Sequence, residues 1–328
     1  MLQEIYPFFL IIFIINLLIF YPLREINLIL KKKYRNKILI KKNEPLSLGG
    51  ILLIINFLFI SVLSYNKDLL YIFNFNEKLT FIILCILIFL IGLLDDLLSL
   101  NPWTRLITTG ILLYFVIIDL DLGLDKIYID FLLTNLKLNT FSNIFTVICI
   151  LTFINFNNMY DGINGQSSIY YLIIIIFLIT KNILPIYLSL FLIFFLFFFF
   201  YNIRNKVYLG DSGIYLVSTI LSVFFLYGFN NKIIFLSEMI CLLFIPFVDM
   251  IRLFVSRLMK LSNPFSGDKN HYHHILSERL NKIFVLLLMH LPPVLGLILL
   301  NISNAYFVPI VLVNLSLYTF FYILFSNK

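Results

Sequence analysis

The sequence predicts an all-α membrane protein that crosses the bilayer many times. Of its 328 residues, 61% are hydrophobic and only 12% are charged, whereas soluble domains average about 45–50% and about 25%. The apolar residues form long segments, many of them close to the roughly 20 residues that a spanning helix needs. A soluble protein is therefore excluded. A disordered chain is excluded too, because such chains are poor in large apolar residues and this one holds 37 Phe.

Segment length and composition predict eleven spanning helices. The first is not a cleavable signal peptide, because no basic segment precedes it and no small-residue cleavage site follows it. No internal repeat or linker divides the chain, so we expect one integral-membrane domain over residues 1–328. The expected spans are 5–23, 46–65, 79–97, 103–119, 141–157, 167–180, 183–201, 212–229, 233–251, 282–300 and 306–326.

Basic residues predict the orientation of these helices. Eight of them lie between Arg24 and Lys42, after the first segment, and loops rich in Lys and Arg remain in the cytoplasm. If the helices alternate from there, 18 of the 24 Lys and Arg residues fall on the cytoplasmic side. The sequence thus predicts an outside N-terminus and a cytoplasmic C-terminus. On the outer side, the alternation from Ile127 to Leu138 favours a short β-hairpin at 127–138.

Cysteine spacing and net charge argue against disulfide bonds, a thiolate metal site and a nucleic-acid partner. Cys85, Cys149 and Cys241 stand singly in apolar segments, so neither a disulfide framework nor a thiolate metal site is indicated. The net charge of +7 is explained by the orientation of the loops. We therefore expect no nucleic-acid partner.

Four polar clusters interrupt the apolar background, and each follows an odd-numbered span. Because the predicted orientation places all four at the cytoplasmic surface, we expect them to form one site there. The clusters are Leu94–Asp96, Asn155–Gly165, Leu209–Gly213 and Asp268–His274.

The aspartates of two clusters are candidates for metal or phosphate chemistry. Asp95 and Asp96 end a span and point about 100° apart on a helix, so only one aims directly at a given ligand. A plain interfacial charge pair is the alternative. Asp211 lies between glycines at a helix start, which would offer free N–H groups to a phosphate. Its alternative is an ordinary helix cap.

A helical stripe of amides and a carboxylate forms the third cluster. Asn155, Asn158 and Asp161 are spaced three residues apart, so they would share one face of a helix. Such a stripe could coordinate a hard cation, hold a sugar, or simply be hydrated.

Histidines mark the fourth cluster most clearly. Three of the four in the chain, His271, His273 and His274, fall within four consecutive positions of a basic loop, which indicates contact with phosphate or a metal. Nearby oxygen donors favour magnesium or manganese over a transition metal. Arg252 adds positive potential for an anionic substrate. His290 lies in a predicted span, where we expect a packed or hydrogen-bonded interior residue.

Carboxylates for a divalent cation and basic groups for negative charge together indicate phosphoryl transfer, in which positioning and charge neutralisation carry most of the catalysis. A site between the membrane and the cytosol would take one lipid substrate and one soluble phosphate compound.

The ordered motifs resemble those of the polyprenyl-phosphate N-acetylhexosamine-1-phosphate transferases (glycosyltransferase family 4), which include the phospho-N-acetylmuramoyl-pentapeptide transferases of peptidoglycan synthesis. The resemblance covers most of the chain. It is carried by Glu44–Gly50, Gly92–Asp96, Asn155-x-x-Asn158-x-x-Asp161-Gly162, Gly210–Gly213, Pro246-x-x-Asp249 and His271–His274.

This resemblance implies a phosphotransferase for substituted phosphate groups in the bacterial inner membrane, with its active site on the cytoplasmic face. It would move N-acetylhexosamine-1-phosphate from a UDP-sugar to undecaprenyl phosphate and release UMP. Such a reaction initiates O-antigen or a related cell-wall glycan. The family requires Mg²⁺, for which Mn²⁺ could substitute. Partners would be UDP-N-acetylhexosamine, undecaprenyl phosphate and membrane lipid, and a homodimer is compatible with the sequence.

The resemblance also implies roles for individual residues. Asp95, supported by Asp96, would activate or orient the lipid phosphate, and Asp211 would bind Mg²⁺. Histidines would contact the diphosphate or the sugar. The catalytic set is Asp95, Asp96, Asp211, His273 and His274; the substrate-binding set is Lys42, Asn155, Asn158, Asp161, Tyr208, Arg252 and His271; and the metal ligands are Asp211 and Asp161. Lys42 and Tyr208 would recognise uracil.

Several positions depart from the family pattern. Asn164 stands where a second Asp is frequent, Arg204-Asn205 where Pro-Ala is usual, and Arg105 where Lys is frequent. The sequence His271-Tyr272-His273-His274 fits the branch that makes O-antigen and teichoic-type glycans better than the muramoyl branch. The muramoyl-pentapeptide transferase remains the alternative within the family.

Two other classes of membrane protein are weighed against this interpretation. An ion-coupled transporter would place its polar residues near the bilayer midplane, often in paired repeats, whereas these clusters lie at one predicted surface. A structural scaffold would not need an aspartate pair, Gly210–Gly213 and three histidines on one side.

Overall fold

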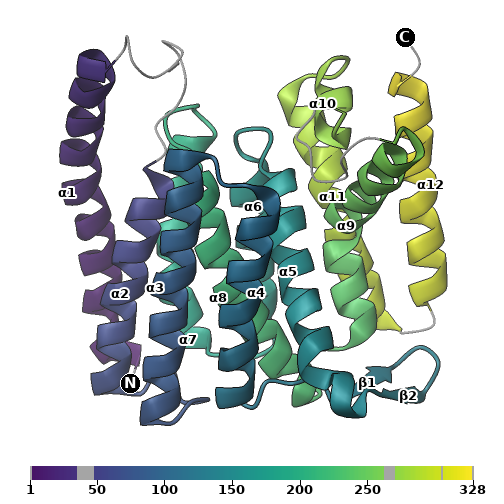
Figure 1. Ribbon diagram of the computed structural model, residues 1–328, viewed down its shortest axis with the longest axis horizontal. Coiled ribbons are helices and arrows are strands. Elements are labelled where there is room, and N and C mark those ends of the chain that lie inside the picture. The colour runs from purple at the N-terminus through teal and green to yellow at the C-terminus, as the bar shows by residue number, and fades with distance from the viewer. Residues whose placement is uncertain (1, 35–47, 262–269, 304–305, 327–328) are drawn as a thin grey trace. The chain divides into compact units, whose positions relative to one another are not determined.

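The computed structural model describes residues 2–34, 48–261, 270–303 and 306–326 (Figure 1). The chain divides into two compact units. The first comprises Met1–Asp121 and Ile174–Leu221, and the second Leu122–Ile173 and Ser222–Lys328. Two helices, α6 (Gln166–Thr180) and α8 (Gly210–Asn230), each begin in one unit and end in the other.

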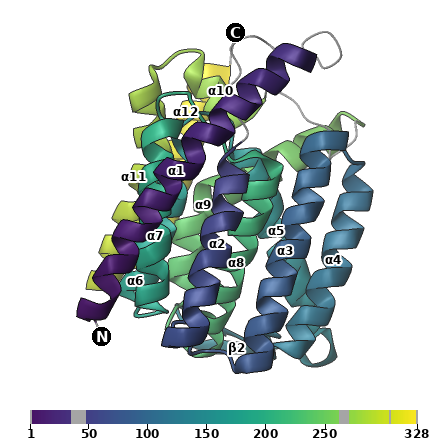
Figure 2. The ribbon, with the colours of Figure 1, turned by 90° about the vertical axis from the view of Figure 1, so that its left-hand side faces the viewer.

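The first unit contains α1 (Leu2–Tyr34), α2 (Gly49–Lys67), α3 (Phe75–Leu98), α4 (Pro102–Asp119) and α7 (Pro185–Asn202). Helices α2, α3 and α4 lie side by side in both views (Figure 1, Figure 2), and α1 packs along α2 and α7. Local sequence sets the helix starts. Asn74 and Glu77 form a capping box at α3, and Asn101 caps α4 with Pro102 at its first position.

A reciprocal amide pair fixes α1 against α2. Asn16 and Asn56 each donate from Nδ2 to the other's Oδ1, at 3.0 and 2.9 Å, and both side chains are buried. Each amide also donates to a carbonyl one turn earlier in its own helix. Because both partners are satisfied, the pair sets the register of the two helices without leaving a buried polar group unpaired.

The second unit is built around α9 (Leu236–Met259), which packs against α5 (Ser142–Tyr160), α11 (Lys282–Ile302) and α12 (Phe307–Ser326). The short helix α10 (Tyr272–Ser277) contacts α11 and α12. Strands β1 (Lys126–Ile129) and β2 (Thr134–Lys137) pair antiparallel, which confirms the predicted hairpin. Asp130, just after β1, ties the hairpin to α9 by accepting from Ser237 N (3.1 Å) and Oγ (2.5 Å).

An all-α polytopic membrane protein is confirmed. Within the described residues, eight helices are long and apolar enough to cross a membrane, and shorter apolar helices lie at Pro7–Leu23, Gly49–Tyr65 and Gln166–Thr180. These segments fall at the predicted positions. Helix α1 continues past its predicted span to Tyr34, and α9 continues to Met259, so Arg252 and Arg257 stand on a helix. Helical periodicity continues through these basic stretches because Lys and Arg are good helix formers.

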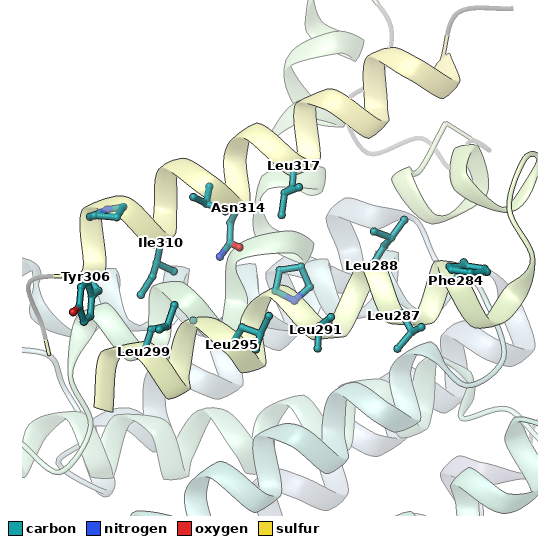
Figure 3. Close-up of a pocket in the computed structure, with 14 residues that line it drawn as sticks. Phe284, Leu287, Leu288, Leu291, Leu295, Leu299, Tyr306, Ile310, Asn314 and Leu317 are labelled. Atoms are coloured by element: carbon teal, nitrogen blue, oxygen red, sulfur yellow. The ribbon is translucent and has the colours of Figure 1, made fainter. Parts of the chain in front are cut away.

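Within the second unit, α11 and α12 enclose an apolar groove of about 350 Å³ (Figure 3). Pro292 and Pro293 interrupt the hydrogen bonding of α11, and Gly296 faces Ile310 of α12. Asn314 lies in the groove with its Nδ2 buried and without a hydrogen-bond partner in the described residues.

Candidate active site

The structure joins the four polar clusters in two pairs, one pair in each unit. The aspartates at the end of α3 meet Gly210–Gly213 in the first unit. The segment after α5 meets the histidine segment in the second unit, where Gly162 packs against the imidazole of His273. Each pairing brings together segments that are more than 100 residues apart in the sequence.

Asp95 anchors the start of α4 against the end of α3. Its buried carboxylate accepts from the backbone N–H of Leu100 (2.9 Å) and from Arg105 Nη1 (2.5 Å). The Arg105 ion pair is largely shielded from water, with side-chain exposures of 20% and 4% for Arg105 and Asp95. A charge-assisted bond in such surroundings is stronger than a surface pair.

Asp96 caps α8. It accepts from the backbone N–H groups of Asp211 (2.8 Å) and Ser212 (3.1 Å) and from Ser212 Oγ (2.8 Å). The expectation that these N–H groups are free for a phosphate was wrong, because a carboxylate of α3 already accepts their bonds. A negative side chain at a helix N-terminus is also favoured by the helix dipole.

Three charged side chains therefore act on Asp211. The carboxylates of Asp95 and Asp96 and the cation of Arg105 all act electrostatically on Asp211, whose side chain is half-buried. Asp95 and Asp96 have different hydrogen-bond partners, Arg105 and the start of α8, but the charges of both act on Asp211. Asp211 is therefore close to negative charge from Asp95 and Asp96 and to positive charge from Arg105.

Glycines allow the backbones of three helices to approach at this cluster. Gly49 and Gly50, at the start of α2, donate to the carbonyls of Tyr208 (3.0 Å) and Leu209 (2.9 Å). A Cβ on Gly50 would lie 2.5 Å from Ser212 Oγ, and one on Gly92 of α3 would lie 2.6 Å from Ser212 Cα. These contacts show that the glycines serve helix packing here.

Gly210 has a second constraint. Its φ is +71°, a left-handed conformation that favours glycine, and a Cβ there would lie 2.8 Å from Asp96 Oδ2. The backbone turn and the carboxylate that caps α8 therefore both depend on this position.

In the second unit, burial differs among the three histidines. His273 is 1% exposed and His271 is 8% exposed, whereas His274 is half-buried. Burial, followed by the neighbouring imidazoles, lowers the pKa of His273 to about 3, so it is neutral at physiological pH. Its Nε2 is buried without a hydrogen-bond partner in the described residues.

The amide stripe is only partly helical. Asn155 and Asn158 lie on α5, and the Asn155 amide donates to Leu151 O at 2.7 Å. Asp161 follows the last helical residue, Tyr160. The prediction that Asp161 shares a helical stripe with Asn155 and Asn158 was therefore wrong, because the helix ends one residue before it. Burial raises the pKa of the Asp161 carboxyl.

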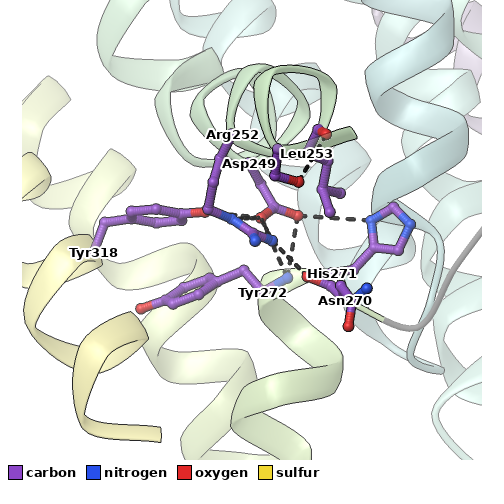
Figure 4. A network of polar contacts seen from close by, with 8 residues as sticks. Asp249, Arg252, Leu253, Asn270, His271, Tyr272 and Tyr318 are labelled. Carbon is purple, nitrogen blue, oxygen red and sulfur yellow. Dashed lines mark hydrogen bonds and ion pairs between the residues drawn. The ribbon is translucent and has the colours of Figure 1, made fainter. Parts of the chain in front are cut away.

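Asp249 of α9 organises the surroundings of the histidine segment (Figure 4). It accepts from Arg252 Nη2 (2.7 Å), Tyr318 OH (2.8 Å) and the backbone N–H of Tyr272 (3.2 Å). His271 Nδ1 lies 3.7 Å from Asp249 Oδ2. Sequence reasoning placed Asp249 in a motif without a role, and Tyr318, which gives no signal in an apolar span, was missed.

Other predicted site residues are placed as follows. Arg252 donates to Asp249 and to Asn270 O, close to the histidines as expected. Tyr208 precedes α8 in the first unit, and its carbonyl bonds to Gly49. Lys42 lies outside the described residues, as does Asp268. His290 bonds to Leu286 O (2.8 Å) and Gln166 O (3.0 Å), which confirms an interior, hydrogen-bonded residue.

The first-unit cluster fits a magnesium ion. No three His, Cys, Asp or Glu side chains form a metal-binding group within the part of the chain that the structure describes. Mg²⁺, however, usually binds one or two carboxylates and completes its shell with water and substrate phosphates. Asp211 beside two further carboxylates offers that donor chemistry.

Two comparisons with known proteins point to the same family of transferases. Residues 79–229 match the sequence model of glycosyl transferase family 4. The chain is also 27% identical over 220 residues to an undecaprenyl-phosphate α-N-acetylglucosaminyl 1-phosphate transferase of Thermotoga maritima. The aligned region covers 66% of this chain and 67% of the relative. The matched region contains Asp95, Asp96, Asp161 and Asp211. The resemblance drawn from the motifs is thereby confirmed.

Proposed function

We propose that this membrane protein transfers N-acetylhexosamine-1-phosphate from a UDP-sugar to undecaprenyl phosphate. The observation that carries the proposal is the cluster of Asp95, Asp96 and Asp211 beside Arg105 at the start of α8. The match to glycosyl transferase family 4 and the name of the Thermotoga relative support the same reaction class. They favour a transferase over an ion-coupled transporter.

In the proposed reaction, an oxygen of the lipid phosphate bonds to the phosphorus that carries the sugar. The bond from that phosphorus to the bridging oxygen breaks, and UMP leaves with the bond's electrons. The products are a lipid-linked diphosphate sugar and UMP. The lipid phosphate is already largely anionic at neutral pH, so it needs orientation more than deprotonation.

The chain's own residues would divide this work. Asp211 would hold Mg²⁺, which neutralises charge on the diphosphate when it is bound. Asp96 keeps Asp211 in place by capping α8, and Arg105 fixes Asp95. In the second unit, Arg252 and the histidines supply groups that suit negatively charged oxygens. Asp161 as a metal ligand, and Lys42 and Tyr208 at uracil, belong to the same proposal.

The location follows from the charge pattern. We place the site on the cytoplasmic face of a bacterial inner membrane, where the soluble UDP-sugar is available. The glycan would be O-antigen or a related cell-wall polymer, because His271-Tyr272-His273-His274 departs from the muramoyl pattern.

The test is turnover by the purified protein in detergent or nanodiscs. The protein is incubated with undecaprenyl phosphate and, separately, UDP-GlcNAc, UDP-GalNAc and UDP-MurNAc-pentapeptide, with Mg²⁺ or with EDTA. We expect magnesium-dependent UMP release with an N-acetylhexosamine donor. Turnover of only the muramoyl donor would assign the alternative branch, and absence of UMP release with all three donors would refute the proposal.

A further inference from the structure

The hydrogen bonds to Asp249 connect three helices of the second unit. Asp249 is 6% exposed and receives bonds from three directions: from Arg252 on its own helix, from Tyr318 on α12, and from the backbone at the start of α10 (Figure 4). A buried carboxylate is costly unless it is paired and hydrogen-bonded. Here the carboxylate of Asp249 is satisfied by donors from α9, α12 and the start of α10.

Tyr318 has a particular place in this network. Its hydroxyl donates to Asp249 Oδ1 and accepts from Arg252 Nε, both at 2.8 Å. Its ring lies against that of Tyr272, with centroids 4.3 Å apart. Tyr318 is 4% exposed and lies 69 residues from Asp249 in the sequence. It therefore connects the last helix to both Asp249 and α10.

The histidine segment receives its position from the same groups. Arg252 Nη2 donates to Asn270 O at 2.5 Å, and the Tyr272 N–H donates to Asp249. These two backbone contacts flank His271, whose Nδ1 faces Asp249 Oδ2 at 3.7 Å. The ring of His271 in turn stacks on that of His273, with centroids 5.3 Å apart.

We propose that Tyr318 and Asp249 are positioning residues for the histidine segment: they fix the backbone at 270–272 and so the placement of His271 and His273. The inference rests on the proposed function, because it assigns those histidines to binding of the UDP-sugar. It extends the site to the last helix, which lies outside the region matched to the family.

The test compares two Tyr→Phe substitutions one helical turn apart. Tyr318→Phe removes the hydroxyl from the network and keeps the ring. Tyr322→Phe is the matched control, because its ring packs on Arg252, 4.5 Å from the guanidinium carbon, and the hydrogen bonds given above do not involve its hydroxyl. Asp249→Asn tests the carboxylate at equal size.

Two measurements are made on the full-length protein. Hydrogen–deuterium exchange over residues 270–277 reports the backbone directly. Steady-state kinetics report KM for the UDP-sugar and for undecaprenyl phosphate separately. We expect Tyr318→Phe to speed exchange in this segment and to raise KM for the UDP-sugar about tenfold, the effect of about one lost buried hydrogen bond. KM for undecaprenyl phosphate should stay unchanged.

The outcomes separate this inference from the proposed function. Faster exchange and a selective KM increase in Tyr318→Phe and Asp249→Asn, but not in Tyr322→Phe, support it. Exchange and kinetics of Tyr318→Phe equal to those of Tyr322→Phe overturn it, as does an equal rise in both KM values. If the wild type turns over no UDP-sugar, the proposed function fails, and the exchange measurement alone decides whether Tyr318 and Asp249 position the segment.

Discussion

The polar cluster of the first unit and that of the second differ in charge. Around Asp211, three carboxylates gather beside one guanidinium. Around Asp249, one carboxylate meets Arg252 and an adjoining group of three histidines. An acidic cluster suits a divalent cation, and a cluster of imidazoles and a guanidinium suits phosphate oxygens. Under the proposed function, Asp211 in the first unit would therefore contact the cation, and Arg252 and the histidines in the second unit would contact the phosphate oxygens.

The two clusters also differ in how they are held. Asp95 accepts from the N–H of Leu100 between α3 and α4, and Asp96 accepts from the N–H of Asp211 at the start of α8. The first cluster therefore depends on close helix packing at glycines. The second depends on side-chain bonds from α12 to α9. Loss of a glycine should therefore disturb the first cluster most, and loss of a hydroxyl the second.

The largest effect should come from Asp211→Asn. Removing the carboxylate that faces the cluster should lower magnesium-dependent kcat by at least about a hundredfold, because the transition-state charge loses its counter-ion. UMP release against Mg²⁺ concentration measures this. Asp125→Asn, an exposed carboxylate of the predicted outer loop, is the control. Near wild-type turnover in a folded Asp211→Asn protein would remove the metal role from the first unit.

Asp95→Asn should have the next largest effect. The change keeps the size of the side chain and the bond from Leu100 but removes the charge that pairs with Arg105. We expect kcat to fall about tenfold to a hundredfold, since a mispaired buried charge also shifts its neighbours. A double-mutant cycle with Arg105→Gln gives the coupling free energy between Asp95 and Arg105. A change of less than threefold would show that Asp95 is structural only.

Gly92→Ala should affect stability through the first cluster. The new Cβ would meet backbone atoms of Asp211 and Ser212 at 2.6 to 2.8 Å, so α3 and α8 must separate. A destabilisation of about 1–3 kcal/mol is expected from overpacking. Thermal unfolding in detergent measures it. Gly296→Ala, whose nearest contact is 3.1 Å from a side chain, is the milder control. Equal losses for both variants would contradict this account of the glycines.

The smallest effect concerns acid stability and tests the second cluster. Burial lowers the pKa of His273 from its ordinary value of 6.5 to about 3, so the unfolded chain binds a proton that the folded protein excludes between these values. Stability should therefore be complete above pH 6.5 and should fall by about 1–2 kcal/mol on acidification to pH 5. Unfolding temperatures from pH 7.5 to 5 measure this. His273→Asn should flatten the slope, and an unchanged slope would place His273 in contact with water.

Several features could be predicted from the sequence because they depend on local pattern. Span positions follow from runs of apolar residues, and the hairpin follows from alternation between Ile127 and Leu138. The link between Asp95-Asp96 and Gly210–Gly213 was expected from their shared predicted face. Their partners were not, since a motif shows which groups are present but not which N–H each carboxylate accepts.

The features that could not be predicted depend on contacts between residues far apart in the sequence. Tyr318 is one of 19 tyrosines, most of them in apolar segments, and nothing in its neighbours distinguishes it. Its role arises only when α12 packs against α9 and places its hydroxyl on Asp249. The glycines that flank Asp211 were expected to let the backbone approach an anion. In the structure, a Cβ on Gly210 would meet the Asp96 carboxylate and one on Gly213 would meet Gly50.

By itself, the sequence determined a polytopic helical membrane protein and the kinds of chemical group in its polar clusters, because burial in a bilayer and side-chain chemistry are properties of local composition. Tertiary structure decided which carboxylate caps α8, which pairs with Arg105, and which histidine is kept neutral. The physical reason is that hydrogen-bond partners and desolvation depend on neighbours in space, and hydrogen-bonded residues lie up to 129 residues apart within the described part of this chain.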